Sequence, residues 1–492
     1  NVPVPIRSTL PPDDPLQLLT WQFAPLASLV LTGILACAWA RPAATARILA
    51  GLHALSVSLL PIGLSFWVFR DLVPLSYPRI YFTYTDVLFF ASDGLIAIAV
   101  VAWALSRWVQ PKNEQASVTK GKGAPVVWLT RLLLALCVVA TLSAIWSVDA
   151  RLSLATSAHL WLLFLFYLSL KNHPVSLRLL TYGASVALLI QAGIGFVEVI
   201  GQTTAFLSPL RMQWPGDIVP AQTGASVVQL ADGARWLRAY GSFPHPNILG
   251  GWASAMMMAP AGWLLLHHRL RLLAIAIVMA SAALIFLSFS RSAWLGCAVG
   301  LMVLGFHWRQ FARRRLIALA LAALLGFGAA AIPLYRMVFT RVAGFGVATE
   351  QQSIEVRTWM TEHSLMMIGA HPWLGVGIGG FVVELVNRNP GDFLLEPAHN
   401  VALLVAAELG LPGLLLVAGI GITLAIGIFK AKQPLAVVAS MMVIVLASVA
   451  AFDHFLWTIA PGRDLLWFAL GIWAGWQLPA MSQNQNDRRL RS

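Results

Sequence analysis

The sequence predicts an all-α protein, a polytopic membrane helical bundle with about 12–14 transmembrane helices and two long external loops. Three observations support this fold class. Hydrophobic residues make up 59% of the 492 residues and charged residues only 11%, which is more apolar surface than a soluble chain could bury. Apolar runs of about 20 residues, the length that spans a bilayer, recur along the chain. Two long polar stretches interrupt these runs.

The same composition argues against other classes. Backbone groups in lipid must be satisfied internally, and the runs are continuously apolar rather than alternating, so helices are expected instead of a β-barrel. The net charge of +13 is compatible with a nucleic-acid binder. However, most Lys and Arg residues lie in short linkers between spans, as the positive-inside rule describes. We therefore expect no nucleic-acid partner, and membrane lipids as the surroundings.

The chain divides into six segments. In order they are N-terminal transmembrane helices at 1–201, a first long loop at 202–246, central transmembrane helices at 247–333, a second long loop at 334–397, C-terminal transmembrane helices at 398–480, and a tail at 481–492. The first span is expected at 17–40. Basic linkers such as 267–271 and 307–315 are expected on the cytoplasmic side, which places both long loops outside. Read literally, the pattern puts the N-terminus outside as well.

The first long loop ends in a segment that could bind an anion, RWLRAYGSFPHPN at 235–247. Arg235 and Arg238 are three residues apart and would share one face if this segment were helical. Arginine suits phosphate because it carries several fixed donors and a permanent charge. Asn247, where the next span begins, could support them. The alternative is that both arginines extend to lipid headgroups.

A single arginine interrupts the long apolar stretch of the central helices. Arg291 lies in the sequence SFSRSAW, and charge inside a membrane is costly enough to indicate function. Ser290 beside it could hydrogen-bond a substrate or satisfy free backbone groups. The alternative is a short external turn with Arg291 at its tip.

The second long loop contains an expected amphipathic helix at 353–370, which would lie on the membrane surface. Its apolar face would include Met360 and Met367, and its polar face Arg357 and Ser364. A glycine-rich turn follows at 371–380. No strand precedes it, so it is not a dinucleotide-binding motif. We expect tight loop geometry there, with backbone amides that could face an anion.

The last candidate is His399-Asn400, at the start of an apolar helix. Free amides at a helix start favour an anionic ligand, and a neutral imidazole can act as a base. Interfacial packing is the alternative for a single histidine. Glu408 lies about 13 Å further along the helix, too far to pair with His399, so it should pair inside the bundle. No histidine, cysteine or carboxylate set has metal-ligand spacing, so no metal or other cofactor is expected.

Taken together, these motifs resemble those of the O-antigen ligase and O-antigen polymerase superfamily. Their order is GSFPHPN, SFSRSAW, EVRTWMTEHSLMMIGAHPWLGVGIGGF and HN-x7-E-x-G-x-x-G, which covers about residues 235–416. The resemblance implies a metal-independent membrane glycosyltransferase in the bacterial inner membrane with a periplasmic active site. It implies His399 as the essential histidine, and Arg238, Arg291 and Arg357 as the arginines that bind the substrate diphosphate.

The resemblance also implies the substrates. The donor is an undecaprenyl-diphosphate-linked glycan, and the acceptor is lipid A–core in a ligase or another lipid-linked glycan in a polymerase. Protein O-glycan ligases of the superfamily use a protein acceptor. A diphosphate is already a good leaving group, so the enzyme needs charge stabilisation and a base. Direct displacement would invert the anomeric centre. A lipid-linked glycan transporter without chemistry is a further alternative.

Overall fold

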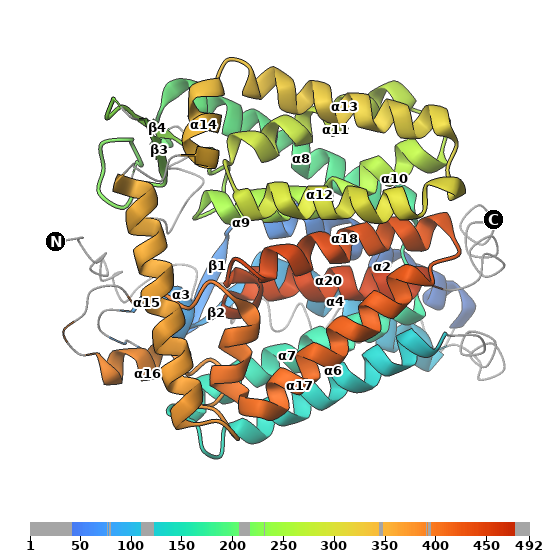
Figure 1. Ribbon diagram of the computed structural model, residues 1–492. Coiled ribbons are helices and arrows are strands. Elements are labelled where there is room, and N and C mark those ends of the chain that lie inside the picture. Colours follow the sequence, from blue (N-terminus) through green and yellow to red (C-terminus); the bar gives the residue numbers. More distant parts are fainter. Residues whose placement is uncertain are drawn as a thin grey trace, which may run out of the picture.

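The computed structural model describes residues 42–75, 77, 80–109, 123–205, 217–230, 232–343, 348–389, 391 and 395–477. The all-α membrane bundle predicted from the sequence is confirmed there, with two small antiparallel hairpins as the β-structure (Figure 1). The elements are α2 (Pro42–Ser65), β1 (Phe69–Val73), α3 (Phe82–Thr85), β2 (Val87–Phe90), α4 (Ala91–Val109), α6 (Ala124–Ser143), α7 (Ala150–Asn172), α8 (Leu177–Gly201), β3 (Val227–Gln229), β4 (Arg235–Leu237), α9 (Pro246–Met256), α10 (Met258–Leu266), α11 (Arg271–Leu287), α12 (Arg291–Phe306), η2 (Trp308–Gln310), α13 (Arg313–Ala331), α14 (Tyr335–Ala343), α15 (Ala348–Ala370), α16 (Phe381–Arg388), α17 (Val401–Phe429), α18 (Pro434–Ala450), α19 (Phe455–Thr458) and α20 (Ala460–Trp476).

Within the described residues, eight helical segments are long and apolar enough to cross a membrane, and three shorter apolar helices accompany them, namely α11, α12 and α18. The first predicted span, 17–40, lies outside the described residues. The most apolar window of the continuous α9–α10 segment is fully buried, whereas the corresponding windows of α13 and α17 are only 17% and 22% buried. Exposed apolar faces are what lipid-facing helices present, so the chain is a multi-pass membrane protein.

Polar residues at the sequence boundaries of the spans start several of these helices. The side chains of Asp149, Ser176, Ser290 and Asn400 accept hydrogen bonds from the first free amides of α7, α8, α12 and α17. Such caps satisfy backbone donors that have no partner inside the helix. These residues therefore begin helices where a loop meets the bundle.

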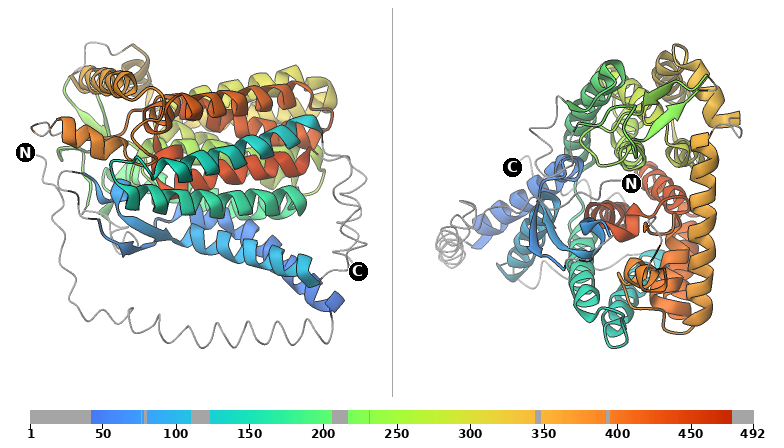
Figure 2. Two further views of the ribbon diagram at one scale, coloured as in Figure 1. Left: turned by 90° about the horizontal axis from the view of Figure 1, so that it is seen from below. Right: turned by 90° about the vertical axis from the view of Figure 1, so that its left-hand side faces the viewer.

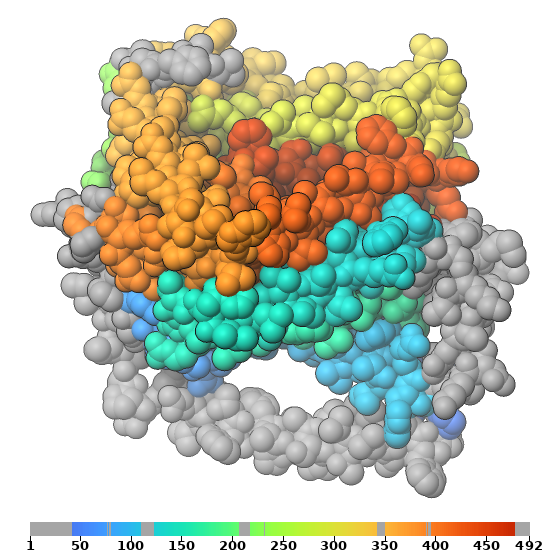
Figure 3. Space-filling view, turned by 60° about the horizontal axis from the view of Figure 1, so that its bottom comes forward, coloured from blue at the N-terminus to red at the C-terminus, as the bar shows by residue number. Residues whose placement is uncertain are grey.

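One helix runs across the others. The apolar helices of the bundle lie roughly side by side, and α15 crosses their ends on the left of Figure 1. Viewed from that side, α15 runs along one edge of the bundle, with the β3–β4 hairpin toward one end of it and the β1–β2 hairpin across the bundle from it (Figure 2). In the space-filling view α15 lies against α17 (Figure 3), and contacts between these two helices confirm this. A helix is therefore present where one was expected in the second loop.

Two details of the loops depend on the structure. The segment with Arg235 is not helical: Arg235 lies in strand β4 and Arg238 follows the strand, so the condition for a shared helical face is not met. Ser364 was expected on the polar face of α15. It is instead fully buried beside Met360 and Met367, and its hydroxyl donates to the carbonyl of Met360 at 2.6 Å. That local bond lets a serine occupy the packed face without an unsatisfied donor.

Helix α17 bends at Gly410, and the glycine-rich turn of residues 371–380 packs into the bend. Gly410 has a φ of 62°, which breaks the helix. Three backbone hydrogen bonds join the turn to α17. Val376 N donates to Ala407 O at 3.0 Å, Gly377 N donates to Glu408 O at 2.9 Å, and Leu411 N donates to Pro372 O at 2.9 Å. The tight geometry predicted for the turn is therefore confirmed. The amides of Val376 and Gly377 bond to backbone carbonyls and do not face an anion.

We predict that Gly410→Ala destabilises the protein more than a glycine-to-alanine substitution at an uncrowded position of the same helix. A Cβ at Gly410 would lie 2.5 Å from the backbone of Trp373, and the positive φ adds strain of about 1–3 kcal/mol for an L-residue. Thermal unfolding followed by tryptophan fluorescence should show a lower midpoint. Gly421→Ala, in the same helix with nothing within 4 Å, is the control and should leave the midpoint unchanged or higher. Equal midpoints in both variants would contradict this account of the bend.

Candidate functional site

Polar side chains from five parts of the chain gather at the end of the bundle that α15 crosses. Four arginines, Arg238, Arg291, Arg341 and Arg357, influence one another electrostatically, and we call them the arginine cluster. Three of them were predicted from the sequence. Arg341, on α14, was not.

Arg238 is buried and is connected through the side chain of Asn247 to the carboxylate of Asp453. Only 6% of Arg238 is exposed, and its Nε donates to the carbonyl of Ser288 at 2.8 Å. Its Nη2 donates to Oδ1 of Asn247 at 2.6 Å, and the Asn247 amide nitrogen donates to Oδ2 of Asp453 at 3.0 Å. Asn247 thus joins a buried cation to a buried carboxylate, which fixes both side chains.

Arg291 and Arg341 share one carboxylate. Nη1 of Arg291 lies 3.1 Å from Oε2 of Glu350, and Arg341 contacts the other oxygen of the same group. The side chain of Arg291 is 45% exposed, whereas those of Arg341 and Glu350 are buried. Glu350 therefore neutralises part of the cluster from inside, and Arg291 remains open to a ligand.

Arg357 projects from α15 toward the same region. Burial lowers the pKa of Arg357 and the nearby Arg291 adds to this, while Asp453, Glu350 and Glu396 act in the opposite direction. A guanidinium stays charged under such shifts because its usual pKa is above 12. The cluster is consequently a permanent cationic surface lined with a few carboxylates.

His399 lies beside a second histidine. Its ring centroid is 5.0 Å from that of His454, and its Nε2 is 3.9 Å from Oε2 of Glu396. Nδ1 of His399 is buried and, among the described residues, has no hydrogen-bond partner. The His399 side chain is 17% exposed, so the ring can be reached from outside. Nδ1 is therefore the ring nitrogen that lacks a partner, and a neutral imidazole in a partly exposed side chain is suited to accept a proton.

His245, which lies in the segment 235–247 with Arg235 and Arg238, has a structural role at the start of α9. Its Nδ1 accepts from the backbone N–H of Asn247 at 3.1 Å, and its Nε2 bonds to the hydroxyl of Ser226 at 2.8 Å. Burial, and then the charge of Arg238, lower its pKa to about 3. His245 is therefore a neutral cap that holds Asn247 in place.

Asp453 is a buried carboxylate whose pKa is lowered by its neighbours. Burial by itself would raise its pKa, but His399, His454, His245 and the hydrogen bond from Asn247 outweigh burial, and the pKa lies below its usual value. A depressed carboxylate pKa adds stability that is present above the unfolded pKa of about 3.9 and is lost as pH falls through the folded pKa.

We therefore predict that Asp453→Asn lowers the thermal midpoint at pH 7, and that the difference from the unaltered protein narrows below about pH 4. Thermal unfolding at both pH values would measure this. Asp232→Asn is the control, because Asp232 pairs with Arg336 where both side chains are about half exposed. Exposed pairs contribute little, so this variant should match the unaltered protein. A difference at Asp453 that is the same at both pH values would refute the electrostatic explanation.

Two groups of side chains have the spacing of metal ligands, although the sequence indicated none. Ligand atoms of His399, Asp453 and His454 lie within 4.8 Å of one another, and so do those of a second trio, Asp93, His159 and Asp464. In the first group both oxygens of Asp453 already accept hydrogen bonds, from Asn247 and from the backbone of His454. In the second, both aspartates bond to Nε2 of His159. Among the described residues, the tertiary structure therefore forms two clusters that sequence spacing could not reveal, and each keeps one buried atom without a hydrogen-bond partner, Nδ1 of His399 and Oδ2 of Asp464.

Three further residues predicted from the sequence lie beside the arginine cluster and His399 or away from them. Ser290 caps α12 just before Arg291. Asn400 caps α17 through Leu403 N at 3.0 Å and donates to the carbonyl of Ala451 at 3.1 Å, which ties the His399 loop to the turn at 451–459. Arg235 is half-buried and donates weakly to the carbonyl of Gln222 at 3.4 Å, away from the arginine cluster.

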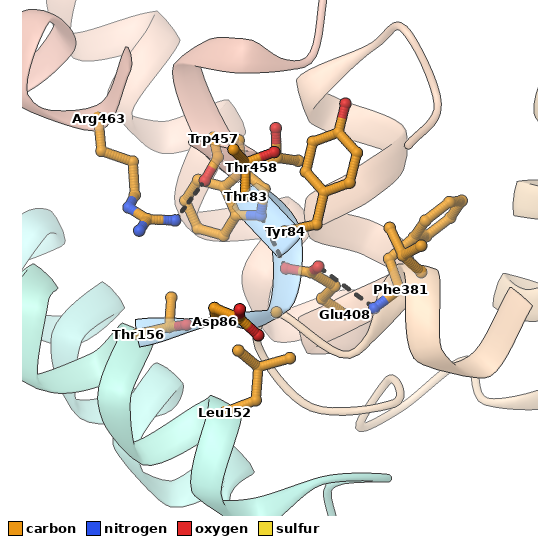
Figure 4. Close-up of a pocket in the computed structure, with 12 residues that line it drawn as sticks. Thr83, Tyr84, Asp86, Leu152, Thr156, Phe381, Glu408, Trp457, Thr458 and Arg463 are labelled. Atoms are coloured by element: carbon orange, nitrogen blue, oxygen red, sulfur yellow. Dashed lines mark hydrogen bonds between the residues drawn. The ribbon is translucent and has the colours of Figure 1, made fainter. Parts of the chain in front are cut away.

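Glu408 lies inside the bundle, and the expectation that it pairs there is confirmed. Its Oε2 accepts from the indole of Trp457 at 2.7 Å and its Oε1 from the amide of Phe381 at 3.4 Å. It lines a small polar cavity of about 50 Å³ together with Tyr84, Thr458 and Arg463 (Figure 4). Glu408 does not contact His399. It connects α17 to the turn that carries Asp453 and His454.

Five site residues escaped sequence reasoning, namely Arg341, Glu350, Glu396, Asp453 and His454. Each lies in or beside a loop that borders an apolar span. For Asp453 and His454 a signal was available, because the pair interrupts two apolar runs in the way that Arg291 does. The others lie among several charged residues of the second loop, where a single sequence gives no reason to prefer one.

A comparison with known proteins matches part of this chain to one family. Residues 274–418 match a protein-family model described as O-antigen ligase, and the matched range includes Arg291, Arg341, Arg357, His399 and Glu408. None of the curated proteins matches the chain. Residues 274–418 are therefore similar to the O-antigen ligase family, and this match supports the resemblance to the O-antigen ligase and polymerase superfamily.

Proposed function

We propose that this protein is a metal-independent glycosyltransferase that moves a glycan from undecaprenyl diphosphate to an acceptor hydroxyl. The reaction takes place at the periplasmic face of the bacterial inner membrane. One observation carries the proposal: a cluster of four arginines lies beside a histidine whose Nδ1 is free of hydrogen bonds, at one end of a membrane bundle.

The arginine cluster is suited to the diphosphate of a lipid-linked donor. Such a headgroup carries two negative charges on a long apolar tail, so it requires fixed cations next to lipid-facing helices. Arg291, the exposed member, would contact the diphosphate first. Arg238 and Arg341 are held in place by Asn247 and Glu350, and preorganised charges of this kind stabilise charge that develops in a transition state.

The reaction follows from these groups. The acceptor oxygen attacks the anomeric carbon, the bond from that carbon to the phosphate oxygen breaks, and the leaving diphosphate keeps the electron pair. His399 takes the proton of the acceptor hydroxyl. The arginine cluster balances the charge on the diphosphate, and direct displacement inverts the anomeric centre. Asp453, ionised beside both histidines, would stabilise the imidazolium that forms on His399.

The acceptor we propose is lipid A–core, which would make the protein an O-antigen ligase. A polymerase that extends lipid-linked repeats, or a ligase that transfers glycan to protein, could use the same groups. A transporter of lipid-linked glycan would need the cationic surface but not the free histidine nitrogen.

A reconstituted transfer assay separates these functions. Purified protein in liposomes receives undecaprenyl-diphosphate glycan labelled in the sugar, with lipid A–core in one sample and only further lipid-linked glycan in another. Product in the first sample alone identifies a ligase, and chain growth in the second identifies a polymerase. A third sample contains a protein acceptor. If the protein binds the donor but forms no product in any of the three samples, the enzymatic proposal is overturned and transport is favoured.

A further inference from the structure

We infer that His454 is a second acceptor-binding residue that presents the lone pair of its Nε2 to the site, and that Thr458 positions its ring. Together with His399 it would select an acceptor with two neighbouring hydroxyls, which is a saccharide and not the single hydroxyl of a serine or threonine. This inference rests on the proposed glycosyl transfer and names the class of acceptor.

The hydrogen bonds around Thr458 assign the His454 tautomer. Nδ1 of His454 lies 2.8 Å from the Thr458 hydroxyl, and the same hydroxyl donates to the carbonyl of His454 at 3.2 Å. A hydroxyl has one proton and can donate it only once. Both contacts are hydrogen bonds only if Nδ1 carries the proton and the hydroxyl oxygen accepts it. Nε2 is then unprotonated and is an acceptor.

The turn that carries His454 is fixed at both ends. At its start the Asn400 side chain donates to the carbonyl of Ala451 at 3.1 Å. At its end Nη1 of Arg463 donates to the carbonyl of Trp457 at 3.0 Å, and the Trp457 indole donates to Glu408. Figure 4 shows Arg463, Trp457 and Glu408 around the cavity behind this turn. Such a frame holds a ring in one orientation, as a binding residue requires.

The position of the His454 ring suits a shared acceptor. It lies 5.0 Å from the ring of His399 and 5.7 Å from that of Tyr84, and a ring nitrogen of each histidine lies within 4.8 Å of the other. Burial, followed by the charge of His399, lowers the pKa of His454 to about 4, so the ring is neutral at pH 7. Neutral His454 can accept a hydrogen bond, whereas a charged ring could only donate.

Two neighbouring hydroxyls fit these two nitrogens. One hydroxyl gives its proton to His399 as it attacks, and the adjacent hydroxyl donates a hydrogen bond to Nε2 of His454. A site built to accept from a hydroxyl discriminates against an analogue without it, because the buried acceptor is left unpaired. An acceptor saccharide that lacks the adjacent hydroxyl should therefore react poorly.

Nitrogen NMR of the full-length protein, labelled with ¹⁵N-histidine, tests the tautomer directly. Nε2 couples to both ring C–H protons and Nδ1 to only one, so the coupling pattern shows which nitrogen carries the proton. The His454 signals are identified by their loss in His454→Gln. We expect the tautomer of His454 with an unprotonated Nε2. Thr458→Ser should retain this tautomer, and Thr458→Val should lose it or show a mixture of both tautomers. A protonated Nε2 in the unaltered protein would overturn the inference, whatever the enzyme does.

Kinetics of the same variants test the binding role. For the saccharide acceptor, Thr458→Val should raise the acceptor KM about tenfold and leave donor KM unchanged, while Thr458→Ser should behave as the unaltered protein. With an acceptor that lacks the adjacent hydroxyl, the Val and Ser variants should be equal. An equal loss with both acceptors would refute the inference. If no acceptor reacts with the unaltered protein, the proposed function fails, and the NMR result still decides the orientation of His454.

Discussion

Replacing His399 with glutamine should lower the transfer rate by about 10²- to 10⁴-fold, the usual contribution of a general base, while donor binding stays unchanged. Glutamine preserves the approximate size of the ring but cannot take a proton from the acceptor. The free Nδ1 of His399 and the neighbouring carboxylates of Glu396 and Asp453 are the basis of this expectation. The measurement is kcat with saturating donor and acceptor, together with direct binding of the labelled lipid donor.

The matched control is His371→Gln. His371 is an exposed histidine after α15 whose Nε2 contacts Arg388 at 3.1 Å, outside the site. It should transfer glycan at the unaltered rate. If His399→Gln transfers glycan at the full rate, His399 is not the base, and another group must take the proton of the acceptor hydroxyl. Loss of donor binding in this variant would instead indicate that the ring holds the diphosphate.

Replacing Arg238 with lysine should lower kcat/KM for the donor by about 10²-fold, equivalent to about 3 kcal/mol of transition-state binding. Lysine keeps the charge but cannot reach Ser288 and Asn247 at once, as the planar guanidinium does. Asn247 would then lose its anchor, and with it the support of Asp453. Donor kinetics in liposomes measure the change, and a thermal midpoint shows whether the fold is retained.

The neighbouring arginine provides the control for this experiment. Arg235→Lys changes a half-buried guanidinium three residues away that bonds to the carbonyl of Gln222 and not to the cluster. Its donor kinetics should remain unaltered. If both variants lose activity equally, general disturbance of the hairpin would explain the result, and Arg238 would have no specific role in donor binding.

The sequence alone determined the membrane fold and most helix starts, and it predicted four of the residues that we propose for the site. Long apolar runs predict helices because lipid leaves the backbone no other partner. A charge inside such a run is costly, so Arg291 could be recognised from the residues around it. Arg238, Arg357 and His399 were recognised from the order of motifs. The order also indicated the family to which the match over residues 274–418 belongs.

Only the tertiary structure decided which charges meet. Arg235 and Arg238 would share a face only in a helix, and Arg235 instead lies in strand β4 with Arg238 directly after it. Asp453 and His454 are more than fifty residues from His399, and they reach it because α17 and α18 return the chain to the same end of the bundle. Apolar patterning is a local property and can be read along the chain. Contacts among buried charges depend on how the loops fold back and the helices pack, and no local pattern encodes that.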